Sequence, residues 1–175
     1  MVISIILPFI FAGIFAQLQV NKENKISWET QKKIWNGVFE TIPNIKDQKR
    51  IVIIIPGYQQ LRPFETYPFL SGWEIEAGTQ VLYNNPNISG NFYYKDIVPT
   101  NLLFTKNGFR PIQTDRIIPY KKLIFVNYDP QSSTVEVVEN LERELQLPFS
   151  VTNYNPYENI APVGPTTADF RGLIR

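Results

Sequence analysis

Residues 50–57 read Arg-Ile-Val-Ile-Ile-Ile-Pro-Gly, a run of β-branched side chains that ends in a Pro-Gly pair. β-branched residues favour extended backbone, and Pro-Gly is typical of a turn. Apolar and polar residues do not alternate along the run, so both faces of the strand are expected to be buried. The sequence therefore predicts a central strand from Ile51 to Ile55.

Two helices are expected around this strand. Ser27 follows a polar linker and can cap a helix that ends before Pro43, with apolar residues recurring near helical spacing between them. A second helix is expected over residues 71–83, followed by an Asn-Asn-Pro breaker. The side chains expected to face the core of this second helix are Trp73, Ala77, Val81 and Leu82.

Short strands are expected at residues 91–94, 101–105, 122–128 and 134–138. Residues 129–133 read Asp-Pro-Gln-Ser-Ser and predict a hairpin turn between the last two strands. From about residue 153 a proline-rich tail is expected to run irregularly over the surface. These elements predict the α/β (α+β) class, with a small mixed sheet packed against two or more helices.

Residues 1–20 form a separate apolar segment, and residues 1–16 carry no charge. Twenty residues of helix can just cross a hydrocarbon core of about 30 Å. A transmembrane helix over residues 1–20, followed by an α/β domain over residues 21–175, is the preferred interpretation. A signal peptide and a buried helix are alternatives, but the segment lacks a basic start, and Ile14 occupies a position where signal cleavage prefers a small residue.

The composition excludes several kinds of chemistry. The 175 residues include neither Cys nor His, so thiolate nucleophiles, Cys/His zinc sites and imidazole bases are excluded. The net charge of +1 gives no reason to expect a nucleic-acid partner. Neither a cofactor nor a metal site is expected, since no carboxylates have metal-like spacing; Asp96, Asp115 and Asp129 fit turns better.

The first candidate ligand site is the turn Gly57-Tyr58-Gln59, which follows the central strand. Open α/β sheets commonly bind ligands at the carboxyl ends of their strands. The turn has a single glycine and no following Lys-Ser/Thr pair, so it matches no phosphate-loop or dinucleotide motif. A plain turn at the end of a strand is the simpler interpretation.

The order of the elements resembles a known group of domains. The motif Trp28-x-x-Gln31-x-x-x-Trp35 follows an apolar span, Ile42-Pro43 closes its helix, and the strand over residues 51–57 and the hairpin over residues 125–138 come next. The chain thus resembles the carboxyl-terminal extracytoplasmic domain of bacterial polytopic membrane proteins, some of which are similar to C-superfamily glycosyltransferases that use lipid-linked sugars. In such enzymes the catalytic carboxylate lies in an early loop, to which no part of this chain corresponds.

This resemblance implies a non-catalytic extracytoplasmic domain, accessory to a membrane glycosyltransferase. Its expected partners are membrane lipid, through residues 1–20, and the remainder of a polytopic protein. The basic flank from Lys22 to Lys33 argues instead for a cytoplasmic domain under the positive-inside rule. The alternative function is a small secreted or anchored hydrolase or transferase that uses carboxylates without His or Cys.

Overall fold

The computed structural model describes residues 2–56, 68–69, 72–95, 102–111 and 114–162, with side chains from residue 13 onward. The elements in chain order are α1 (Val2–Thr41), β1 (Arg50–Ile55), α2 (Gly72–Leu82), β2 (Ser89–Tyr94), β3 (Leu102–Thr105), β4 (Gly108–Pro111), β5 (Ile118–Pro119), η2 (Tyr120–Lys122), β6 (Leu123–Asp129), β7 (Thr134–Val137), α3 (Leu141–Leu145) and η3 (Pro156–Glu158). The expected α/β class, with sheets packed against helices, is confirmed.

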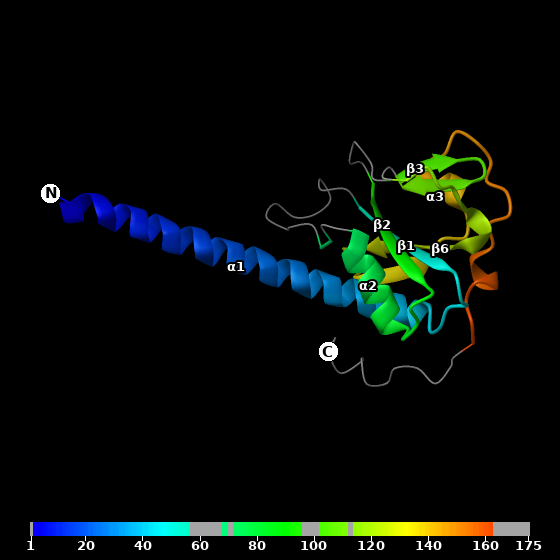
Figure 1. The fold of residues 1–175 in the computed structure, drawn as a ribbon, viewed down its shortest axis with the longest axis horizontal. Coiled ribbons are helices and arrows are strands. Elements are labelled where there is room, and N and C mark those ends of the chain that lie inside the picture. The colour runs from blue at the N-terminus through cyan, green and yellow to red at the C-terminus, as the bar shows by residue number, and fades with distance from the viewer. Residues whose placement is uncertain (1, 57–67, 70–71, 96–101, 112–113, 163–175) are drawn as a thin grey trace.

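The first helix is a single element of 40 residues. The expected linker before Ser27, and a helix beginning there, are therefore wrong. No Gly or Pro interrupts residues 14–36, and side chains one turn apart hydrogen-bond along the helix, as from Gln19 to Glu23 at 2.8 Å. In Figure 1 its amino-terminal half projects from the domain as a long stalk.

The structure describes no side chains for residues 1–12. Within the residues that it does describe, no helix is long and apolar enough to cross a membrane.

The main sheet has the strand order β2-β1-β6-β7, and β1 is parallel to both of its neighbours. The expected central position of β1 is confirmed, since residues 51–55 are fully buried. Ile51, Ile53 and Ile55 pack under α1 and α2, while Val52 and Ile54 face the opposite side. The expected hairpin is also present as β6 and β7, and Asp129 accepts a hydrogen bond from the Gln131 amide at 2.9 Å.

The opposite face of β1 is covered by β3, which is the strand expected at residues 101–105, and by β4, β5 and α3, which the sequence patterns did not indicate. A small antiparallel sheet with the order β3-β4-β5 and the short helix α3 contribute Leu102, Phe109 and Leu141 to the second core cluster. Strands β4 and β5 are four and two residues long, and both end in proline, so neither has an alternating pattern to detect. Of the layer on this side of β1, the sequence therefore predicted β3 but not β4, β5 or α3.

Helix α2 lies where it was expected and Leu82 is buried as expected, but the rest of its buried face is different. Ile75, Thr79 and Leu82 are buried, whereas Trp73 and Val81 are 69% and 47% exposed. The backbone of β2 approaches α2 closely, because an added Cβ at Gly90 would lie 2.4 Å from the Ile75 side chain. Because the two backbones lie so close, only small or medium side chains such as Ile75 and Thr79 fit between α2 and β2. The face of α2 that carries Trp73 therefore points away from the sheet.

The expected irregular tail from about residue 153 is confirmed as far as residue 162, and it is attached to the domain by hydrogen bonds. Ile160 forms an isolated bridge with Ile45. The side-chain amide of the buried Asn159 donates a hydrogen bond of 3.0 Å to the Leu123 carbonyl. The backbone carbonyl of Asn159 accepts a hydrogen bond of 3.0 Å from the backbone amide of Lys46. The tail thus ties the turn after α1 to the beginning of β6.

The central position of β1 predicts a large cost for shortening one of its side chains. We expect Ile53→Ala to lower the free energy of unfolding by about 2 to 5 kcal/mol, because it leaves a cavity between β1 and the helices. The control is Ile117→Ala, since Ile117 is 46% exposed and this change should cost less than about 0.5 kcal/mol. Denaturant titration measures both, and equal costs would contradict a central β1.

The contact between α2 and β2 predicts that a single added methyl group is harmful. Gly90→Ala would push a Cβ against Ile75 and the Thr79 hydroxyl, so we expect it to lower the free energy of unfolding by about 1 to 3 kcal/mol. The matched control is Gly72→Ala, because a Cβ at Gly72 meets no atom within 4 Å. Thermal unfolding compares the two, and an unchanged Tm for Gly90→Ala would refute the close packing.

Candidate functional site

A polar pocket of about 440 Å³ lies at the edge of the main sheet where its parallel strands begin. Arg50 and Ser89 are the first residues of β1 and β2 and are paired in the sheet, and Lys122 immediately precedes β6. Thr114 and Arg116, from the segment between β4 and β5, line the other side. The pocket is therefore formed between the amino-terminal edge of the main sheet and the small sheet.

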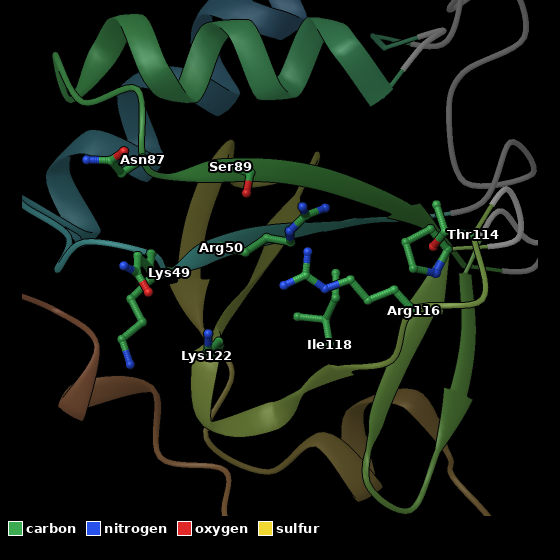
Figure 2. Close-up of a pocket in the computed structure, with 10 residues that line it drawn as sticks. Lys49, Arg50, Asn87, Ser89, Thr114, Arg116, Ile118 and Lys122 are labelled. Carbon is green, nitrogen blue, oxygen red and sulfur yellow. The ribbon is translucent and has the colours of Figure 1, made fainter.

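Among the described residues that line this pocket, four are cationic and none is acidic. The four are Lys49, Arg50, Arg116 and Lys122, which we call the basic cluster. Figure 2 shows the guanidinium groups of Arg50 and Arg116 lying toward one another in the pocket, with the Ser89 hydroxyl above them. Asn87 and Thr114 add further groups that can donate hydrogen bonds.

Arg50 is held in place by the fold of the sheet. It lies on the same face of β1 as Val52 and Ile54, and it donates a hydrogen bond to the Asn91 amide oxygen of β2. Burial lowers the pKa of Arg50, and the nearby Arg116 lowers it further, while Glu76 has the opposite effect. The charged guanidinium is thus partly removed from water, and the hydrogen bond to Asn91 and the charge of Glu76 do not fully offset the cost of this burial.

Lys49 experiences the same kind of environment. Burial is the main cause that lowers the pKa of Lys49, and the positive charges of Lys46, Lys122 and Lys121 lower it further. The negative charge of Glu158 raises this pKa and so offsets part of the effect. The ammonium group of Lys49 donates to the Lys121 carbonyl at 3.3 Å. Because like charges raise the free energy of the protonated form, an anion that entered the pocket would relieve this repulsion.

The carboxylates near the pocket do not neutralise it. Within the described parts of the chain, the ion pairs are Lys32–Glu29, Lys95–Glu144 and Arg110–Asp115, and no carboxylate is paired with a member of the basic cluster. Two Arg and two Lys side chains therefore share one concave surface with no ion-paired acid. Such a surface can hold an anion with several negatively charged oxygens.

The sequence placed its candidate site at the other edge of the sheet. Gly57, Tyr58 and Gln59 lie outside the described residues, so their prediction stays untested. The pocket was missed because the rule for open α/β sheets points to the carboxyl ends of strands. The available signal was two basic pairs, Lys49-Arg50 and Lys121-Lys122, each directly before an apolar strand.

No group of three or more acidic residues that could hold a metal ion is found in the part of the chain that the structure describes. Comparisons of the chain with protein-family models, with curated proteins and with solved structures found no match.

The lowered pKa of Lys49 predicts a pH-dependent effect of removing its charge. The penalty on the protonated amine is fully present below its folded pKa, and it is relieved as the pH rises toward the ordinary lysine value. We expect Lys49→Gln to raise Tm more at pH 7 than at pH 10, relative to the wild type. Lys106→Gln, at an exposed turn between β3 and β4, controls for the loss of a positive charge. A Tm increase for Lys49→Gln that is the same at pH 7 and pH 10 would contradict a lowered pKa for Lys49.

Proposed function

We propose that the chain is a non-catalytic binding domain, held at a membrane by its amino-terminal helix, whose basic pocket binds a multiply charged oxyanion such as a di- or triphosphate group. The observation that supports this most strongly is the basic cluster, which lines a pocket of about 440 Å³ in whose wall none of the described residues is acidic.

The chemistry of the cluster favours phosphate groups over a single carboxylate. A guanidinium group offers paired N–H donors that match the oxygens of phosphate, and an ammonium group adds a compact charge. One carboxylate carries one negative charge, whereas four cations can be balanced by two or more phosphate groups. Hydroxyl groups of Ser89 and Thr114 line the same wall and can bond further oxygens.

Binding without catalysis is the function that these residues support. General acid and base catalysis need a titrating group near the reacting atoms, and the usual candidates are His and carboxylates. The chain has no His, and the lining of the pocket, as far as the structure describes it, includes no Asp or Glu. The alternative of a small hydrolase or transferase that uses carboxylates has no comparable support in this pocket.

The membrane part of the proposal rests on the apolar character of the stalk. Ile14, Phe15, Leu18 and Val20 are all about half exposed or more, and successive helix residues point about 100° apart. By this spacing Ile14, Phe15 and Leu18 lie within an arc of about 100°, and Val20 lies on the other side of the helix. Residues 1–16 carry no charged side chain on any face, which suits a lipid environment. With residues 1–20 uncharged, the segment has the composition of a span.

The resemblance noted in the sequence adds a location to this proposal. On that basis the domain would lie outside the cytoplasm, at the end of a polytopic membrane protein, and would be accessory to a membrane glycosyltransferase. In this arrangement the domain binds a ligand, and the transfer of sugar is carried out by the membrane-embedded part of the polytopic protein.

Calorimetric titration of the full chain in a neutral detergent with inorganic pyrophosphate tests the binding. We expect saturable binding in the wild type and a loss of at least tenfold in affinity for Arg116→Gln, because a charge-assisted hydrogen bond contributes about 1.5 to 3 kcal/mol. Arg116 is exposed, so this variant should fold normally.

The matched control is Lys106→Gln, which removes the same charge at an exposed residue that is not among those lining the pocket and should leave the affinity unchanged. Equal weakening by both variants would show that pyrophosphate responds only to net charge, and no binding by the wild type would refute the proposed function.

A further inference from the structure

We infer that the basic pocket opens on the side of the domain that faces away from the membrane, so that its ligand is a soluble phosphate-bearing molecule and not a lipid headgroup of the bilayer that holds α1. This inference rests on the proposed function, because it identifies the source of the anion that the pocket binds. It follows from the direction in which α1 crosses the sheet.

The stalk enters the domain at the carboxyl ends of the parallel strands. Gln31 donates a hydrogen bond to the Pro68 carbonyl, and the adjacent Phe69 is bonded through both its amide and its carbonyl to the Tyr94 hydroxyl, at 3.1 and 2.8 Å. Tyr94 is the last residue of β2. The segment of α1 around Gln31 therefore lies at the carboxyl edge of the main sheet.

The chain leaves α1 at the opposite edge. The Ile42 carbonyl accepts a hydrogen bond of 2.7 Å from the Tyr83 hydroxyl, and Tyr83 lies between the end of α2 and the beginning of β2. Four residues later, Lys46 bonds to Asn159, which in turn bonds to Leu123, the first residue of β6. The turn after α1 is thus at the edge where the parallel strands begin, which is the edge that carries the pocket.

Figure 1 shows the same arrangement, with the amino-terminal half of α1 extending away from the domain and β1 running back toward the stalk. A helix rises 1.5 Å per residue, so the stretch from residue 20 to residue 41 covers about 30 Å. If residues 1–20 span the membrane, the pocket lies roughly this far beyond the hydrocarbon.

Lipid headgroups do not reach that distance. The polar region on each side of the hydrocarbon core is only about 5 to 8 Å thick. A helix tilt of about 20°, which is the average for membrane spans, shortens the height of the pocket by only a few ångströms. The surface potential of anionic lipids also falls off within a Debye length of about 8 Å at physiological ionic strength. A phosphate group in the pocket must therefore come from solution.

The test uses the full chain in two kinds of lipid nanodisc, at 0.15 M salt, titrated with inorganic pyrophosphate. One disc contains only zwitterionic phosphatidylcholine, and the other also contains 30% phosphatidic acid, whose headgroup is a phosphate monoester. We expect the same pyrophosphate affinity in both discs, within threefold, because the headgroups cannot occupy the pocket. In both discs Arg116→Gln should weaken binding at least tenfold, and Lys106→Gln should not.

A pyrophosphate affinity that falls by more than threefold in the phosphatidic acid discs would overturn the inference, because it would mean that headgroups compete for the pocket or that the pocket lies within their surface potential. This result would leave the proposed function standing, since binding would still occur in the zwitterionic discs. An absence of Arg116-dependent binding in the zwitterionic discs would instead refute the proposed function, and the inference with it.

Discussion

The burial of β1 on both faces is the constraint on which the rest of the fold depends. Residues 51–55 are apolar and have no exposed surface, so the chain must supply a cover for each side. Helices α1 and α2 cover one side, and the small sheet with α3 covers the other. Parallel neighbours on both edges complete the backbone hydrogen bonds of the strand, which makes β1 the element that positions all the others.

This arrangement also accounts for the charges at one edge of the sheet. Strands β1, β2 and β6 run parallel, so the residues where they begin, including Arg50 and Ser89, come together although they are far apart in the sequence. The small sheet is needed to cover Val52 and Ile54, and its connecting segment brings Arg116 against the same edge. A basic pocket thus results from a requirement of the core. Its four cations form no ion pair with a carboxylate of the described residues, and this excess positive charge is the reason to expect an anionic ligand.

The sequence predicted the elements whose patterns are local. Five adjacent β-branched residues indicated β1, and the turn at Asp129, which is followed by the alternating segment 134–138, indicated the hairpin of β6 and β7. The polar stretch before Ser27 predicts a linker, but α1 is continuous there, because polar residues without Gly or Pro continue a helix readily. The face of α2 was misjudged because the close approach of Gly90 is a property of two elements together. The pocket forms because β1 pairs with β6, which lies about 70 residues later in the chain, and a local sequence pattern does not indicate which distant strands will pair.

The central claim is that an oxyanion binds between Arg50 and Arg116, and the most direct measurement is a crystal structure of the full chain soaked with tungstate, a heavy-atom analogue of phosphate. The account predicts an anomalous peak within hydrogen-bonding distance of both guanidinium groups, at the edge where β1 and β2 begin. A peak only elsewhere on the surface, with this pocket free of tungstate, would contradict it.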